Sequence, residues 1–198
     1  MQVEIQDDVI VEAMEVLINH ILYGRGVYPS HIFKKKRVYN TPVFISIFPP
    51  LNNYLAGVLR SAQELICRRE LQCLEIIVYH DDSKKSEIYK ITLGTRRDGQ
   101  SAEDCLLHSE QQLRSAIYKI SERLNQIPKP AAGRCHFKIH LHTTQEAFIR
   151  LSHEAQYQEF PWIQAYNPES QLPPGTASLL PLTTMANLGL RMEAVIHG

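Results

Sequence analysis

The sequence predicts an α+β fold in which an antiparallel sheet packs on three helices. Three stretches have helical hydrophobic periodicity: 7–23, 51–69 and 102–127. Apolar runs typical of strands stand between and after them: 43–48, 74–80, 87–93 and 135–143. The tail, 160–198, holds five of the 11 prolines but only three formally charged side chains. That proline spacing excludes a helix, and the low charge is unlike a disordered tail. We therefore expect extended segments that lie against the domain or against a partner.

The first two helical stretches differ in how they are buried. Residues 7–23 are apolar almost all round, which predicts a helix buried on most sides. Asp7 and Asp8 suit its positive N-terminal end. Residues 51–69 present a single apolar face and follow Pro49 and Pro50, which end the preceding strand.

The strands also differ in their patterns. Residues 74–80 scarcely alternate, which predicts a central strand covered on both faces. Residues 87–93 alternate and form an antiparallel hairpin with them. Residues 135–143 alternate strictly, with an apolar face opposite a polar one. The apolar set is Cys135, Phe137, Ile139 and Leu141; the polar set is His136, Lys138, His140 and His142. The polar stretch 144–159 is expected to be briefly helical.

Composition narrows the function classes. Lys and Arg together number 21, as do Asp and Glu, so a protein that grips nucleic acid alone is disfavoured. The basic run Lys34–Arg37 predicts a solvated loop or an edge strand, with DNA-phosphate contact or nuclear import as alternatives. No apolar run reaches membrane-spanning length, and the acidic start is unlike a signal peptide. Four cysteines without a CxxC pair predict reduced, packed thiols in a cytosolic or nuclear protein.

Catalytic motifs are missing from the sequence. It has no GxSxG elbow and no glycine-rich phosphate loop. The main metal candidate is the trio His136, His140 and His142, which would make the chain a metal-binding enzyme. Lys138 lies among them on the same strand face, so a solvated sheet face is the preferred interpretation. We predict a non-enzymatic protein without a metal or cofactor.

Several short motifs resemble HORMA-domain proteins when taken in order. They are Ile21-Leu22-Tyr23, Val27-Tyr28-Pro29, Ile32-Phe33, Tyr39-Asn40-x-Pro42-Val43, Leu51-Asn52-x-Tyr54, Phe160-Pro161-Trp162-Ile163 and Pro181-Leu182-x-Thr184-Met185. The resemblance covers nearly the whole chain. It implies a single HORMA domain over 1–198, with a core of about 1–150. Residues 151–198 would form a mobile C-terminal β region, the safety belt.

The resemblance implies an adaptor that traps a proline-containing partner peptide beneath this belt. The peptide would add a strand to the sheet edge. The residues expected to contact it are Tyr54, Pro161, Trp162, Ile163 and Gln164. The implied partner is the catalytic subunit of DNA polymerase zeta, which the adaptor would link to translesion-synthesis and repair factors in the nucleus, with some protein in the cytoplasm. A spindle-checkpoint or meiotic adaptor is the alternative within the family.

Further surfaces follow from the same resemblance. Leu179, Glu193 and Val195 occupy positions that contact a scaffold polymerase of translesion synthesis. Glu193 and Val195 depart from the more polar-aromatic residues of relatives, so the contact would use different side chains here. Arg114 and Lys35 match the surface through which HORMA domains pair. An AAA+ ATPase that opens such belts is a further expected partner. Neither nucleic acid nor membrane is expected to bind directly.

Overall fold

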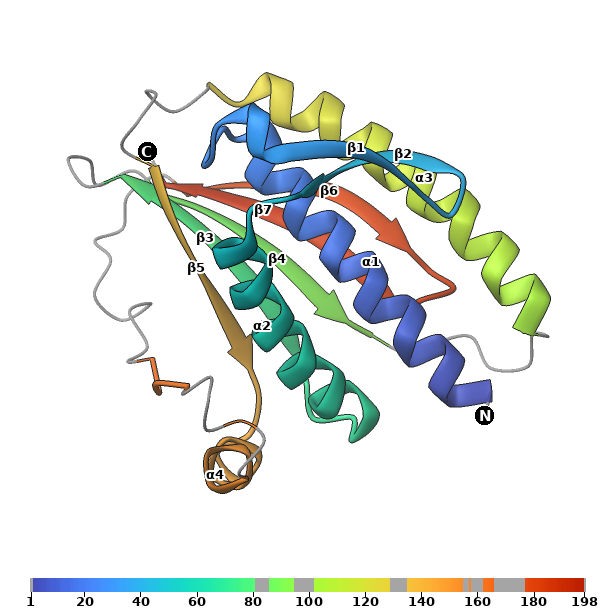
Figure 1. Cartoon of the computed structure of the whole chain (residues 1–198), viewed down its shortest axis with the longest axis vertical. Helices are drawn as coiled ribbons and strands as arrows, with labels where there is room; N and C mark the ends of the chain where they lie inside the picture. Colours follow the sequence, from blue (N-terminus) through green and yellow to red (C-terminus); the bar gives the residue numbers. More distant parts are fainter. Residues whose placement is uncertain are drawn as a thin grey trace.

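The computed structural model describes residues 2–80, 86–94, 102–128, 135–154, 157, 162–165 and 177–197. Four helices and seven strands follow one another along these parts of the chain (Figure 1). The helices are α1 (Gln2–Gly24), α2 (Pro49–Cys67), α3 (Ala102–Gln126) and α4 (Gln145–His153). The strands are β1 (Phe33–Val38), β2 (Thr41–Ser46), β3 (Cys73–His80), β4 (Ser86–Leu93), β5 (Cys135–His142), β6 (Ala177–Met185) and β7 (Leu190–His197). The predicted α+β class is confirmed.

Five strands form one antiparallel sheet in the order β5-β3-β4-β7-β6. Helices α1, α2 and α3 pack on one face of this sheet (Figure 1). The core is a single cluster that joins α1 to the helix-facing side chains of the strands, such as Leu74 and Ile76. Strand β3 lies inside the sheet, and its opposite face is also covered, since Ile77 is only 9% exposed. The predictions for this strand and for its hairpin with β4 are confirmed.

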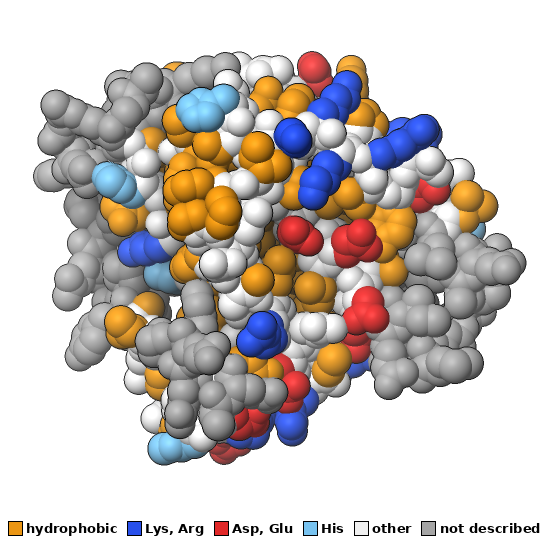
Figure 2. Space-filling view, viewed as in Figure 1, with side chains coloured by type: hydrophobic (Ala, Val, Ile, Leu, Met, Phe, Trp, Pro, Cys, Tyr) orange, Lys and Arg blue, Asp and Glu red, His pale blue; other side chains and the backbone are white. Residues whose placement is uncertain are grey.

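The basic run forms the edge strand β1 of a separate two-stranded sheet with β2. Tyr39 and Asn40, both at positive φ, make the turn. Lys and Arg side chains gather over this hairpin, with acidic side chains along the neighbouring α1 (Figure 2). Lys36 lies close enough to Glu15 to act against the burial that raises the pKa of that carboxyl. The preferred interpretation, a solvated edge strand, is therefore confirmed, and its charge is partly neutralised within the domain.

Two helix boundaries differ from the sequence predictions. Helix α1 begins at Gln2, so Asp7 lies in its second turn and is 3% exposed rather than capping the N-terminus. Helix α2 includes Pro49 and Pro50 in its first turn, where proline's missing N–H has no helical partner to lose. Helix α4 is confirmed, with the Thr144 side chain accepting the Ala147 amide hydrogen at 3.2 Å.

The C-terminal hairpin lies on the sheet edge opposite β5. Strand β7 pairs with β4 along its whole length, and β6 pairs outside it. Of the tail that was predicted to be extended, strands β6 and β7 are therefore part of the main sheet, whereas 162–165 lies outside it. Among the described cysteines, Cys73 is buried but Cys67 is exposed, so the prediction of packed thiols is wrong for Cys67. No helix in the described ranges is long and apolar enough to cross a bilayer.

A buried ion pair fixes the end of α1. Arg25, whose side chain is 0% exposed, donates to both carboxylate oxygens of Glu87 on β4, at 2.7 and 2.5 Å. Its guanidinium also donates to three carbonyls at the C-terminal end of α3, those of Leu124, Ile127 and Pro128. The Tyr89 hydroxyl donates to the same Glu87 carboxylate at 2.7 Å. One side chain thus joins α1, α3 and β4.

Candidate functional site

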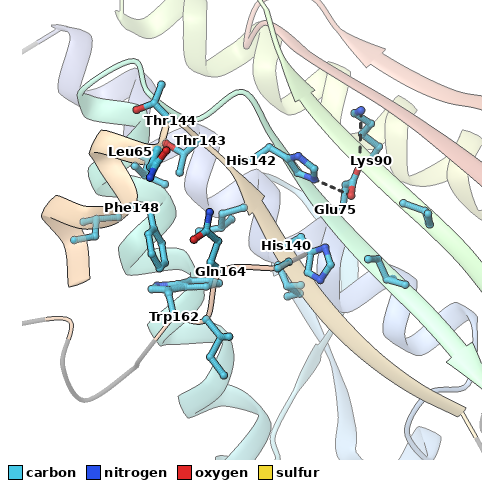
Figure 3. A pocket seen from close by; sticks show the side chains of 18 residues that line it. Leu65, Glu75, Lys90, His140, His142, Thr143, Thr144, Phe148, Trp162 and Gln164 are labelled. Carbon is cyan, nitrogen blue, oxygen red and sulfur yellow. Dashed lines mark ion pairs between the residues drawn. The ribbon is translucent and has the colours of Figure 1, made fainter. Parts of the chain in front are cut away.

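A cavity of about 500 Å³ opens beside β5, at the edge of the main sheet (Figure 3). It is formed by α2, β3, β4, β5, α4 and the segment 162–165. The apolar lining comes from both sides of the edge strand: Leu65, Ile77, Ile88, Ile139, Leu141, Phe148, Leu151 and Trp162. The polar lining includes Glu75, Lys90, His140, His142 and Gln164. Since residues from both faces of β5 line it, the cavity extends around the strand's outer edge.

Strand β5 turns backbone amide and carbonyl groups toward the cavity along its outer edge. The Gln72 amide donates to the His142 carbonyl at 2.9 Å, so the His142 carbonyl faces β3. The backbone groups of alternate residues point the other way. A hydrogen bond between the Ile139 backbone and the Tyr54 hydroxyl agrees with this alternation, in which the Ile139 backbone points away from β3. Ile139 and Leu141 therefore turn their amide and carbonyl groups outward, and no strand in the described ranges pairs with them. Such an edge is suited to accept another strand.

Trp162 is attached to α2. Its indole N–H donates to the Ser61 hydroxyl at 2.9 Å, and this hydroxyl donates to the Gly57 carbonyl at 3.1 Å. Ser61 is fully buried. The Trp162 ring lies next to Phe148 in the cavity wall (Figure 3). The hydrogen bond to Ser61 thus holds one wall of the cavity in place.

Replacement of Ser61 by alanine should loosen Trp162. The indole loses its acceptor while the helix keeps a good helix-forming residue, so we expect a cost of about 1 kcal/mol. Because Trp162 is the only tryptophan of the chain, its fluorescence reports this change alone. We expect stronger acrylamide quenching and a red-shifted emission in Ser61→Ala. Ser152→Ala, which removes an exposed hydroxyl bonded within α4, is the matched control. Equal quenching in the two variants would contradict the anchoring role.

Helix α4 supports the adjoining part of the wall, where Phe148 lies next to Trp162. The Arg150 guanidinium pairs with the Glu70 carboxylate, with one bond of 3.0 Å, and this ion pair raises the pKa of Arg150. The Thr143 hydroxyl donates to the Glu70 carbonyl at 3.0 Å. These bonds connect α4 and the residue Thr143 before it to the loop after α2. They place Phe148 and Leu151 along the cavity.

A charged cluster forms the polar wall. The Glu75 carboxylate lies 2.8 Å from the His142 imidazole and 3.6 Å from the Lys90 ammonium (Figure 3). Burial pushes the pKa of Glu75 upward, but the hydrogen bond with His142 and the nearby positive charges outweigh it and hold this pKa below its usual value. Burial and the Lys138 charge lower the pKa of His140. Glu75 therefore stays ionised at neutral pH beside the Lys90 ammonium.

The proposed three-histidine metal site does not form. His136 and His142 are separated along β5 by about 20 Å, which is too far for one ion. His136 instead lies near Tyr79, with ring centroids 5.7 Å apart. His142 lies with Cys73 and Glu75, whose potential ligand atoms are within 4.8 Å of one another. The Glu75 carboxylate in this group is already paired with Lys90.

The structure brings together most of the residues predicted to contact a peptide. Trp162, Ile163 and Gln164 all line the cavity. Tyr54 lies outside its lining, but its ring packs edge-on against Phe137 of β5, with centroids 5.6 Å apart. Burial is the main cause that raises the pKa of Tyr54. Pro161 lies outside the described residues.

The residues predicted for other partners lie on two separate surfaces. Leu179 and Val195 are direct cross-strand partners on β6 and β7, and Glu193 is two residues from Val195, on the same face. Leu179 is 56% exposed. Arg114 is exposed on α3, where it pairs with Glu110 at 3.0 Å. Lys35 is exposed on β1, in the hairpin whose other strand, β2, contacts α3. Leu179, Arg114 and Lys35 are therefore each accessible from solvent.

Comparison with known proteins identifies the fold. The family model described as the HORMA domain matches residues 8–146. The chain belongs to the HORMA-domain family. It is 65% identical to the DNA polymerase zeta subunit 2 of Drosophila melanogaster, over 99% of both chains. It is 32% identical to the mitotic spindle assembly checkpoint protein MAD2B of Danio rerio, over 96% of this chain and 89% of that protein. HORMA proteins are adaptors rather than enzymes, so this membership confirms the predicted absence of catalysis.

Solved HORMA structures support the same fold at lower identity. A chain in the crystal structure of the mitotic checkpoint complex aligns with a TM-score of 0.76 and 16% identity, over 97% of this chain and 98% of that one. Caenorhabditis elegans HTP-2 bound to closure motif 1 of HTP-3 aligns with a TM-score of 0.63 and 14% identity, over 96% and 83%. The predicted HORMA-like fold is thereby confirmed.

Proposed function

We propose that this HORMA protein is an adaptor that traps a proline-containing partner peptide along the outer edge of β5. The observation that carries the proposal is that no strand in the described ranges pairs with the outer edge of β5, where Ile139 and Leu141 turn their backbone groups outward beside a cavity of about 500 Å³. An added strand gains main-chain hydrogen bonds from such an edge and selectivity from its side pockets. The segment 162–165 forms the wall over this edge and acts as part of the safety belt.

The strand order supports a closed belt. The C-terminal hairpin pairs with β4, at the side of the sheet away from β5. Because that hairpin occupies the opposite edge, it leaves the β5 edge available. Trp162 and Tyr54 flank the available edge on its α2 side. We propose that these two aromatic residues are the main peptide contacts, with Pro161, Ile163 and Gln164 completing the site.

Similarity to polymerase zeta subunit 2 supports the partner assignment. The trapped peptide belongs to the catalytic subunit of polymerase zeta, and the adaptor links it to translesion-synthesis and repair factors. The patch of Leu179, Glu193 and Val195 receives the scaffold polymerase, and Arg114 with Lys35 forms a surface for pairing with another HORMA domain. An AAA+ ATPase opens the belt. These partners place the protein in the nucleus, with a cytoplasmic fraction.

A checkpoint or meiotic adaptor is the second candidate. It is favoured by the fold shared with a chain of the mitotic checkpoint complex and with HTP-2. The mechanism of peptide capture would be the same, while the captured peptide would come from a different partner. Affinity purification followed by mass spectrometry separates the two, because polymerase subunits are expected with the first and checkpoint or chromosome-axis proteins with the second.

Trp162→Ala should weaken peptide capture about thirtyfold, as expected for an aromatic residue at the centre of an interface. Isothermal titration with proline-containing peptides from the polymerase zeta catalytic subunit measures this loss, and Tyr54→Ala should act in the same direction. Tyr118→Ala is the control, because Tyr118 is 68% exposed on α3, away from the cavity. Unchanged affinity in Trp162→Ala and Tyr54→Ala, or no binding to the unaltered protein, would refute peptide trapping at this edge.

A further inference from the structure

The face of β5 that points away from the helices carries a row of basic side chains. His136, Lys138, His140 and His142 alternate with the apolar residues that pack toward the helices. The two sets lie on opposite faces of an edge strand, so a strand added beside β5 meets both. Its residues directly opposite the basic row would point to the same face as that row.

The charges around this row are unequally paired. Glu75 is the single acidic residue among those that line the cavity, and it is engaged by Lys90 and His142. Lys138 forms no ion pair with a described residue. Its ammonium lies 5.8 Å from the centroid of the Tyr79 ring and is exposed to solvent. Burial and the Lys138 charge lower the pKa of His140, which favours the neutral imidazole beside the Lys138 ammonium.

The positions on either side of Lys138 favour apolar partners rather than acidic ones. Phe137 and Ile139, on either side of Lys138, turn their side chains to the helix-facing side and pack against the core. Residues of an added strand opposite these two would enter an apolar environment, where an unpaired charge is costly. Edge strand β5 therefore offers a positive position between two apolar ones.

We infer that the trapped segment carries an acidic side chain opposite Lys138, between two apolar residues that face the helices. This inference rests on the proposed peptide capture and specifies the chemistry of the peptide. The carboxylate and the ammonium would form a cross-strand pair on the partly exposed face of the sheet. A lysine or arginine at the same place would be repelled by Lys138.

A charge scan of the peptide tests the inference. In the bound proline-containing peptide, each position is replaced in turn by Glu, Gln and Lys, and affinity is measured by isothermal titration. At one position we expect Glu to bind about threefold to tenfold more tightly than Lys, with Gln between them. Glu at the two adjacent positions should weaken binding, because those side chains face the apolar side.

Substitutions of Lys138 in the protein test whether it is the residue that contacts this peptide position. In Lys138→Glu, the same peptide position should prefer Lys, and in Lys138→Gln it should lose its charge preference. Lys119→Glu makes the same charge change on an exposed position of α3 and should leave the preference as it was. If peptides bind but no position shows a preference that Lys138→Glu reverses, the inference is wrong while peptide capture stands. If no peptide binds the unaltered protein, the proposed capture fails as well.

Discussion

Arg25→Ala should destabilise the protein by about 3–5 kcal/mol, the largest stability effect we expect from a single charge. The substitution leaves the Glu87 carboxylate, whose side chain is 14% exposed, without its partner. It also removes the donor to three carbonyls at the end of α3. Urea unfolding followed by circular dichroism measures the loss in the free energy of unfolding.

Two further variants separate this network from an ordinary ion pair. Arg68→Ala removes an exposed pair with Glu64, one turn away on α2, and should change stability by less than about 0.5 kcal/mol. The double variant Arg25→Met, Glu87→Leu should recover part of the loss, because no uncompensated charge remains. A cost for Arg25→Ala similar to that of Arg68→Ala would show that the buried network contributes little.

Leu141→Pro should abolish most peptide capture while keeping the fold. Proline removes the outward amide of Leu141, the group that a partner strand would use, and its ring occupies the space beside the edge. Proline is tolerated in edge strands when the missing N–H faces away from the sheet. Within the new ladder it should cost about 3 kcal/mol, or roughly a hundredfold in affinity. Titration with the proline-containing peptide gives the affinity, and urea unfolding checks the fold.

Matched substitutions isolate the backbone contribution. Leu141→Ala keeps the amide but removes the side chain, so it should bind far better than Leu141→Pro. His140→Pro removes an amide that faces β3 and should destabilise the sheet itself. Equal affinities for Leu141→Pro and Leu141→Ala would contradict strand addition at β5, since only the first variant lacks the main-chain donor.

The sequence patterns predicted most elements because their signals are local. The single-face periodicity of α2 and the strict alternation in β5 depend on neighbours along the chain, and both are confirmed. Strand β1 was only one of two expectations for Lys34–Arg37, because four consecutive basic residues have no alternation. That β5 lies at an edge depends on strand order, which its own alternation does not encode.

The site was predicted in the same uneven way. Trp162 was found through the family resemblance, but Ser61, which fixes its indole, was missed. A serine in the apolar pattern of α2 gives no sign of a tertiary partner 101 residues away. The pairing of Glu75 with His142 was equally hidden, because the two residues become neighbours only when β3 and β5 align.

The strand order has a consequence for how long a partner stays bound. Strand β5 and the hairpin β6–β7 occupy opposite edges of one sheet and are covalently joined through the segment that includes 162–165. If a segment is trapped as proposed and has folded domains at both ends, it cannot slide out lengthwise and leaves only when the belt opens. The lifetime of the complex is then a property of the adaptor. Partners of different sequence would then share one residence time. Competition among them would depend on how fast each one is captured.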